Sequence, residues 1–94
     1  MIFEWDDDKA TANEQKHGVN FETAARVFLD PNRLEDFDLE HGGDEDRWIT
    51  IGLVEAWLLM VVYTERRETV RLISARKATK NEKKAYRQIQ SRRQ

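Results

Sequence analysis

Apolar residues recur with two different periods along this chain, and the change between them predicts the order of its elements. A short apolar run at residues 2–5 predicts a strand. Asp6, followed by more acid, is typical of a helix N-cap, and Gly18 after Lys16 and His17 is typical of a helix end. The pattern therefore predicts a first helix that closes at the sequence Lys-His-Gly.

A second short helix is predicted after Asn20, which is a favourable N-cap, and it ends at Asp30-Pro31. From there the period falls to two, which is typical of strands. We expect a four-stranded antiparallel meander over residues 33–39, 48–54, 57–64 and 69–75, with turns at 41–46, near 55 and at 65–68. The run LLMVVY predicts the most buried strand.

The last segment predicts a helix that runs to about residue 91. Thr79 and Glu82 fit the capping box, in which each side chain bonds the other residue's backbone amide. Ala85, Tyr86 and Ile89 share the predicted apolar stripe of this helix. The chain thus reads as one α+β domain over residues 1–94, with two N-terminal helices, a four-stranded antiparallel sheet, a short extra N-terminal strand and a C-terminal helix.

Charge is divided unevenly along the chain. Residues 1–46 contain 14 acidic and 4 basic side chains, a net of −10, whereas residues 47–94 contain 4 acidic and 12 basic ones, a net of +8. Such a split indicates a basic surface for a polyanion or an acidic partner, or two halves that pair with each other. The chain has no cysteine and no apolar run of membrane-spanning length, so we expect a cytoplasmic protein without disulfides.

Two histidines limit the possible chemistry. His17 is in the last turn of the predicted first helix, where a protonated imidazole stabilises the helix dipole or, alternatively, transfers a proton near neutral pH. His41 lies in an acidic, glycine-containing segment that fits no defined calcium loop and is best interpreted as a hairpin tip.

Arginines near the third and fourth predicted strands are the candidates for phosphate binding. Arg66 is in a predicted hairpin near Arg71, and strict alternation places Arg71 and Arg76 on opposite faces unless a bulge intervenes. Several guanidinium groups around one sheet end would bind phosphate, because the planar fork donates paired hydrogen bonds. The alternative is an edge strand protected by charge.

The start of the last helix adds two further candidates. Glu82 is the acid of the capping box, and its position also predicts an ion pair that holds Arg76 in place. Tyr86, one turn later, is most simply a core residue with a solvent-exposed hydroxyl.

Three segments together resemble the BrnT toxins of type II toxin–antitoxin systems. They are FEWDDDKATANEQKHGVNFETAARVFLDP, RWITIG and YTERRETVRLISARKATKNEKKAY, and they cover nearly the whole chain in order. The resemblance implies a RelE-like ribonuclease fold, metal-independent RNA cleavage that inhibits translation, and neutralisation by a BrnA-like antitoxin. It implies RNA and that antitoxin as partners, a homodimer or toxin–antitoxin heterotetramer, and no cofactor or metal.

Cleavage of RNA by its own 2′-hydroxyl needs a proton-transfer group and cations for the phosphate, and this chemistry suggests roles for individual residues. We expect His17 to transfer the proton and three arginines to bind phosphate and stabilise charge, namely Arg66, Arg71 and Arg76. Glu82 would orient Arg76, and RNA would contact Lys16, Lys80, Lys83 and Tyr86. Two alternatives stay open: a non-catalytic nucleic-acid-binding module, which would bind RNA in a salt-dependent way without product, and a protein-interaction subunit.

Overall fold

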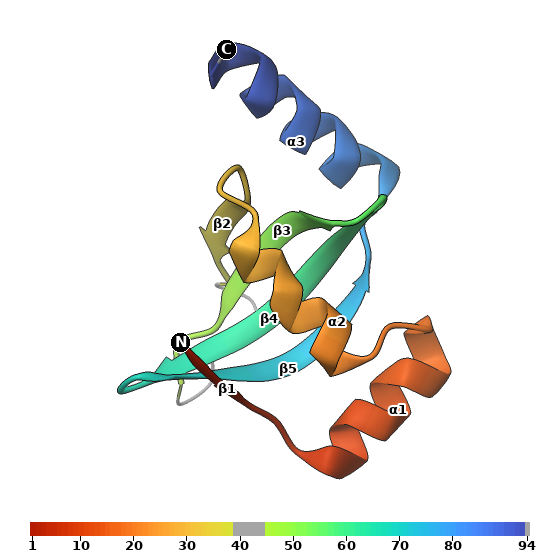
Figure 1. The fold of residues 1–94 in the computed structure, drawn as a ribbon, viewed down its shortest axis with the longest axis vertical. Helices are drawn as coiled ribbons and strands as arrows, with labels where there is room; N and C mark the ends of the chain where they lie inside the picture. The colour runs from red at the N-terminus through yellow and green to blue at the C-terminus, as the bar shows by residue number, and fades with distance from the viewer. Residues whose placement is uncertain (39–44, 94) are drawn as a thin grey trace.

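The computed structural model describes residues 1–38 and 45–93 of the chain (Figure 1). The elements follow in the order β1 (Ile2–Glu4), α1 (Asp7–His17), α2 (Phe21–Ala25), the 3₁₀ turn η1 (Arg26–Leu29), β2 (Leu34–Phe37), β3 (Trp48–Val54), β4 (Trp57–Arg66), β5 (Thr69–Lys77) and α3 (Lys80–Arg93). The predicted α+β class and element order are confirmed. His41 and most of the predicted turn at 41–46 lie outside the described residues.

The ends of the first two helices follow from their capping residues. The Asp6 carboxylate accepts a hydrogen bond from the Lys9 amide at 3.0 Å, and Gly18 ends α1 in the left-handed region at φ 71°. The Asn20 side chain accepts from the Thr23 amide at 2.8 Å. All three predicted caps are confirmed, so the sequence Lys16-His17-Gly18 is a sharp corner between α1 and α2.

The sheet has one strand more than the predicted meander. Strands β2 to β5 form the expected antiparallel meander, but β1 pairs with β5 in parallel, giving the order β1-β5-β4-β3-β2 across the described residues. The predicted short N-terminal strand is confirmed, but the expectation of a four-stranded, purely antiparallel sheet is wrong, because that strand joins the sheet in parallel. Apolar alternation could not reveal this pairing, because β1 and β5 are far apart in sequence and Phe3 simply adds to the core beside Val70.

The two faces of the sheet differ in what covers them. On one face, α2 and η1 bury the main core: Phe21, Ala24 and Val27 pack with Leu59, Val61, Tyr63, Val70, Leu72 and Ala75. Burying each large apolar side chain stabilises the fold by about 1.5–3 kcal/mol. On the other face, α3 contacts one end of the sheet through Leu58, Ala78 and Tyr86, with Leu34 and Ile51 beside them. Figure 1 shows α3 extending beyond that end of the sheet.

Helix α3 begins as predicted, but its buried stripe is narrower. The Thr79 amide donates to the Glu82 carboxylate at 2.8 Å and the Glu82 amide donates to the Thr79 hydroxyl at 3.2 Å, which confirms the capping box. Tyr86 is buried, whereas Ala85 is exposed, so placing Ala85 on the apolar stripe is wrong. Among the described helices, none has the length and apolar character required to cross a bilayer.

Candidate active site

The register between β4 and β5 decides which way the arginines of β5 face. Arg71 is opposite Thr64 and Arg76 is opposite Met60, and these two β4 residues share a face because they are four positions apart. Ile73 is the extra residue, where the pairing shifts by one. The bulge therefore brings Arg71 and Arg76 to the same face, and the opposite faces given by strict alternation are wrong.

The three arginines do not gather at one end of the sheet, which corrects the sequence-based expectation. Arg66 is opposite Thr69 beside the β4–β5 turn, and Arg71 is close to it along β5. Arg76 lies five residues further on, which corresponds to roughly 15 Å of strand. The three guanidinium groups also pair with different carboxylates: Arg76 with Glu82, Arg66 with Glu45 and Arg71 with Glu4. The Arg76 end and the Arg66 end of β5 are separate places.

At the Arg76 end, the guanidinium is held by two hydrogen bonds from its tip to Glu82. Nη1 donates to Oε1 at 2.8 Å and Nη2 donates to Oε2 at 3.0 Å, while Nη1 also donates to the Lys77 carbonyl at 3.2 Å. The Arg76 side chain is only 32 % exposed. Hydrogen bonding from Arg76 lowers the pKa of Glu82 below its ordinary value, and the capping amide of Thr79 acts in the same direction. The predicted pairing of Glu82 with Arg76 is confirmed.

This arrangement leaves one edge of the Arg76 guanidinium for a ligand. An arginine has five N–H donors, and the hydrogen of Nε and one hydrogen of Nη2 point side by side from the edge next to the tip. Within the described residues, Arg76 donates hydrogen bonds from Nη1 and from one hydrogen of Nη2. The Nε hydrogen and the second hydrogen of Nη2 have no acceptor there. A phosphate oxygen pair fits such an edge. Glu82 thus orients the guanidinium without using all of its donors.

The end of α1 is fixed against the same end of β5 by a buried amide. The Asn13 side chain accepts from the Ala75 amide at 3.0 Å and donates to the Ala75 carbonyl at 2.8 Å, as a neighbouring strand would. His17 follows Asn13 by one helical turn on the same side of α1. The corner after α1 and Lys77 line one pocket. The sequence Lys16-His17-Gly18 therefore lies at the end of β5 that carries Arg76.

His17 is half-buried, and Lys16 is exposed. Within the described residues, the imidazole of His17 makes no hydrogen bond or ion pair. Both ring nitrogens are thus available to exchange a proton with a ligand at this corner.

At the Arg66 end, both arginines face carboxylates. Arg66 donates to Glu45 through Nη2 and through Nε, the latter at 3.3 Å, and these side chains are 48 % and 46 % exposed. Arg71 lies 3.6 Å from the Glu4 carboxylate. The hydrogen bond from Arg66 lowers the pKa of Glu45. The Arg66 pair is solvent-screened, so a phosphate can exchange with Glu45, whereas the Arg71 side chain is only 29 % exposed.

The RNA-binding candidates of α3 differ in their accessibility. Lys80 and Lys83 are exposed at the start of the helix. Tyr86 is only 3 % exposed, so its ring has no face open to a base, and we do not retain it as an RNA contact. Its hydroxyl is not solvent-exposed as predicted, because it donates to the Asp30 carboxylate at 2.5 Å.

Sequence reasoning missed Asp30, which ties α3 to the rest of the fold. Burial alone would raise the pKa of Asp30, but hydrogen bonds from Tyr86 and from the amides of Leu53 and Asn32 outweigh burial and lower it. Asp30 therefore anchors the helix that carries Glu82. The only sequence signal at this position was a helix-terminating Asp-Pro pair, which says nothing about a partner 56 residues away.

A family model described as a ribonuclease toxin, BrnT, of a type II toxin–antitoxin system matches residues 5–82. The chain belongs to this BrnT family. No curated protein matches the chain. The matched segment contains the α1 corner, both ends of β5 and Glu82, whereas Tyr86 lies beyond it.

Membership of the BrnT family has two direct consequences for this site. A ribonuclease toxin acts on RNA, and a type II system pairs the toxin with a protein antitoxin.

In the described part of the chain, no three carboxylate or imidazole side chains are grouped so that they could hold a metal ion.

Proposed function

We propose that this BrnT toxin is an endoribonuclease of RelE-like architecture that cuts cytoplasmic RNA without a metal ion and so inhibits translation. In the proposed reaction, a 2′-hydroxyl of the RNA attacks the adjacent phosphorus atom. The bond from phosphorus to the 5′-oxygen breaks, leaving a 2′,3′-cyclic phosphate and a 5′-hydroxyl. The reaction needs a base for the attacking hydroxyl, an acid for the leaving oxygen and donors for the charge on the phosphate.

The paired hydrogen bonds between Arg76 and Glu82 carry this proposal. A guanidinium that is already oriented needs no reorganisation when negative charge develops on the phosphate oxygens. The free edge of Arg76 supplies two parallel N–H donors to those oxygens. Glu82 acts through Arg76 and does not touch the RNA, so its role is positioning.

His17 is the group we assign to proton transfer. An imidazole nitrogen can accept or donate a proton, so the side chain can act as base or as acid. The corner that carries His17 lies at the Arg76 end of β5, and its ring nitrogens have no partner within the described residues. Lys16, exposed beside it, contributes positive charge for the RNA backbone.

Arg66 and Arg71 bind other phosphates of the same RNA. They lie toward the other end of β5 from Arg76, and the ion pair of Arg66, about half exposed, is open to exchange. Lys80 and Lys83 extend the basic surface along the start of α3. The RNA backbone would then follow β5 between its two ends, held by charge at one end and cut at the other.

We also propose that a BrnA-like antitoxin neutralises the toxin by covering this basic surface in a toxin–antitoxin heterotetramer. An acidic or amphipathic segment is the partner that matches the net charge of +8 in the second half of the chain. RNA should then compete with the antitoxin for the toxin. An antitoxin that contacts only α1 and leaves Arg66 and Arg76 open to RNA would contradict occlusion.

The direct test is to incubate the purified toxin with a defined RNA in EDTA and to map the ends of the products. We expect cleavage to continue, with 2′,3′-cyclic phosphate and 5′-hydroxyl ends, and to stop when the scissile nucleotide is 2′-deoxy. Activity that disappears in chelator and returns with a divalent ion would rule out the metal-independent mechanism. RNA binding without any product would favour the non-catalytic module.

A further inference from the structure

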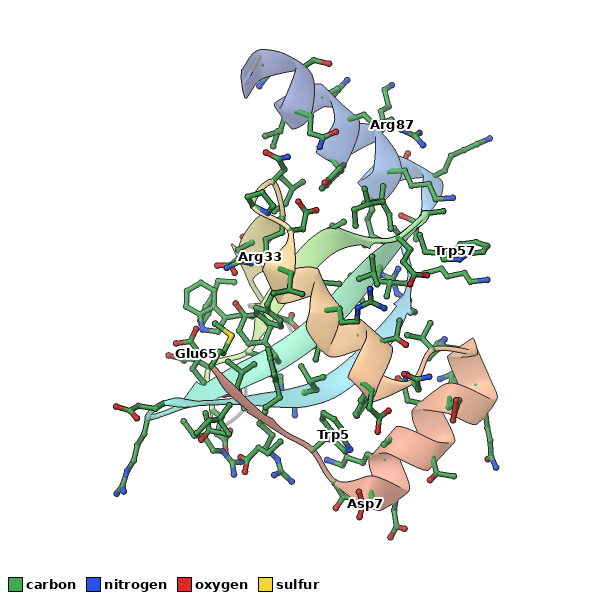
Figure 2. The ribbon with its side chains drawn as sticks, viewed as in Figure 1. Trp5, Asp7, Arg33, Trp57, Glu65 and Arg87 are labelled. Atoms are coloured by element: carbon green, nitrogen blue, oxygen red, sulfur yellow. The ribbon has the colours of Figure 1, made fainter. Side chains whose placement is uncertain are left out.

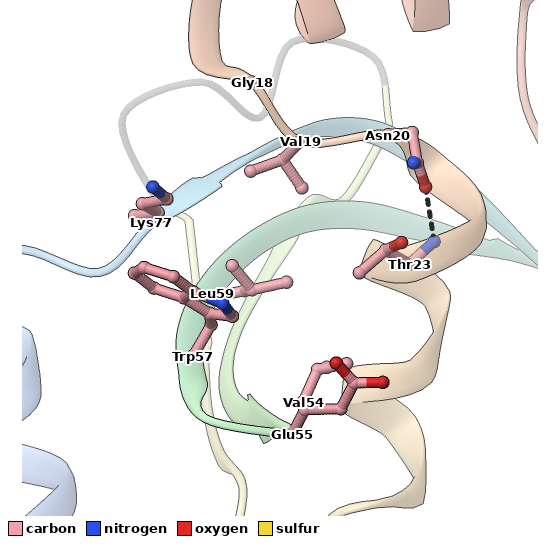
Figure 3. Close-up of a pocket in the computed structure, with 9 residues that line it drawn as sticks. All are labelled: Gly18, Val19, Asn20, Thr23, Val54, Glu55, Trp57, Leu59 and Lys77. Atoms are coloured by element: carbon pink, nitrogen blue, oxygen red, sulfur yellow. Dashed lines mark hydrogen bonds between the residues drawn. The ribbon is translucent and has the colours of Figure 1, made fainter.

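A pocket of about 320 Å³ lies on the other side of the strand end from Arg76. The corner after α1, the start of α2, the β3–β4 turn and the end of β5 each contribute to its wall (Figure 3). Its floor is apolar, from Val19, Val54 and Leu59, while its rim carries Asn20, Thr23 and Glu55. None of the proposed catalytic groups lines it, although two of its wall segments directly adjoin His17 and Arg76.

Trp57 is the unusual feature of this pocket. Trp57 is 56 % exposed. It lies beside a tight turn in which Glu55 has a φ of 56°. Figure 2 shows Trp57 projecting at the edge of the molecule. The Lys77 ammonium lies 4.2 Å from the centre of its ring. A large ring left in water beside a cation is the arrangement that RNA-binding proteins use to stack an unpaired base.

The position of Lys77 connects the pocket to the proposed cleavage site. Lys77 follows Arg76 directly, so their Cα atoms are about 3.8 Å apart, and their side chains point to opposite faces of β5. An RNA strand with a phosphate on Arg76 can therefore pass the end of β5 and place a neighbouring base on the Trp57 side. Lys77 neutralises the backbone at that crossing.

The rim of the pocket suits the polar edge of a base. The Asn20 oxygen is used by the Thr23 amide at 2.8 Å, which leaves the Asn20 NH₂ group as a donor. The Thr23 hydroxyl can donate or accept, and the Glu55 carboxylate accepts, although it also pairs with Arg26 at 3.3 Å. An apolar floor with donors and acceptors on one side matches a flat heterocycle better than it matches a phosphate or an aliphatic chain.

We propose that this pocket binds one unpaired nucleobase of the RNA, stacked on Trp57, next to the nucleotide that is cut. The inference rests on the proposed ribonuclease function and adds a subsite to it. Because the stack forms with bound RNA before and during cleavage, its loss raises KM more than it lowers kcat.

The first test measures binding of a fully 2′-O-methylated single-stranded RNA, which lacks the attacking hydroxyl. Trp57→Ala should weaken binding by about 5- to 150-fold, the range that corresponds to 1–3 kcal/mol per stacked base. Trp57→Phe should recover most of the affinity, because phenylalanine keeps an aromatic face on which a base can stack, although a smaller one. Leu29→Ala is the matched control, because Leu29 is 80 % exposed and lies away from this pocket; it should bind like the parent.

An abasic scan of the same RNA then locates the base. One abasic position should cost the parent protein about as much as Trp57→Ala does, and should cost the Trp57→Ala variant nothing more. Equal losses at every position, or additive losses in the variant, would overturn the stacking proposal.

Three outcomes separate this proposal from the one on which it depends. If Trp57→Ala binds RNA like the parent while Arg76→Ala still loses cleavage, the subsite is wrong and the ribonuclease assignment stands. If Trp57→Ala weakens only the complex with antitoxin, the pocket is a protein-docking surface and the subsite is wrong. If the parent protein neither binds nor cuts RNA, both proposals fail.

Discussion

At one end of β5 the Arg76 guanidinium shares a carboxylate with a helix cap, whereas at the other end Arg66 meets its carboxylate in open solvent. Glu82 is bound by Arg76 and by the Thr79 amide at the same time, so the ion pair is fixed by the geometry of α3. The Arg66 pair is about half exposed on both sides. Identical side chains on two paired strands, Arg66 at the end of β4 and Arg76 in β5, are therefore held in very different ways.

The difference separates two tasks that a basic surface performs. An exposed arginine on a hairpin contributes charge, and salt screens that contribution. An oriented arginine contributes donors in fixed directions, which stabilise a transition state because they do not have to move. We therefore assign chemistry to the Arg76 end and RNA retention to the Arg66 end.

The largest effect is expected at His17. It is the proposed proton-transfer group, and it would act together with Arg76 at the same end of β5. His17→Ala should lower the single-turnover rate by about 10²–10⁴-fold through lost proton transfer. RNA affinity should change little. Parent-like cleavage by the folded variant would remove His17 from the mechanism.

Glu82→Gln tests whether orientation of Arg76 matters separately from helix capping. Glutamine keeps the capping box, because its side-chain oxygen still accepts from the Thr79 amide, but it loses the charge that binds Arg76. We expect a rate about 10²-fold lower, as for a small misplacement of a catalytic group, together with a lower melting temperature near neutral pH, because the stabilisation from ionised Glu82 is lost. A parent-like rate would mean that Arg76 does not need Glu82 to hold it in position.

The pH dependence of stability follows from the same carboxylate. The pKa of Glu82 lies below its ordinary value of 4.5 in the folded chain, so the ionised form stabilises the fold. That contribution is complete above the ordinary value and is lost as the pH falls through the folded pKa. Urea unfolding across this acid range should show a shallower decline in unfolding free energy for Glu82→Gln than for the parent. Equal slopes would contradict the pairing.

The smallest effect is expected at Arg66. Arg66→Ala should leave melting and the rate at saturating RNA nearly unchanged, because its ion pair is solvent-exposed. It should weaken RNA binding and reduce the slope of log affinity against log salt by about 0.7, the value for one lost phosphate contact on a single strand. A rate loss as large as that of Arg76→Ala would contradict the assignment of chemistry to the Arg76 end and RNA retention to the Arg66 end.

Local sequence signals predicted the elements well because the residues that start and stop them act on near neighbours. Asp6, Gly18, Asn20 and the Thr79–Glu82 box all bond within three or four residues. The family resemblance, carried by long segments, was confirmed over residues 5–82.

The features that the sequence did not predict depend on contacts between residues far apart in the chain. The bulge at Ile73 depends on how β4 and β5 align along their whole length, and it reverses the facing of Arg71 relative to Arg76. The parallel pairing of β1 depends on where α1 returns the chain. Asp30 reaches Tyr86 across 56 positions, and no local pattern indicates that contact.

The central claim is that Arg76 stabilises the transition state while Arg66 only retains RNA. The measurement that tests it most directly is single-turnover cleavage and thermal melting of Arg76→Ala and Arg66→Ala on the same preparations. We expect Arg76→Ala to melt as a folded protein yet to cut about 10²–10³-fold more slowly, with Arg76→Lys recovering only part of the rate because an ammonium lacks paired donors. Arg66→Ala should cut at nearly the parent rate. A folded Arg76→Ala variant that cuts as fast as the parent would contradict the account.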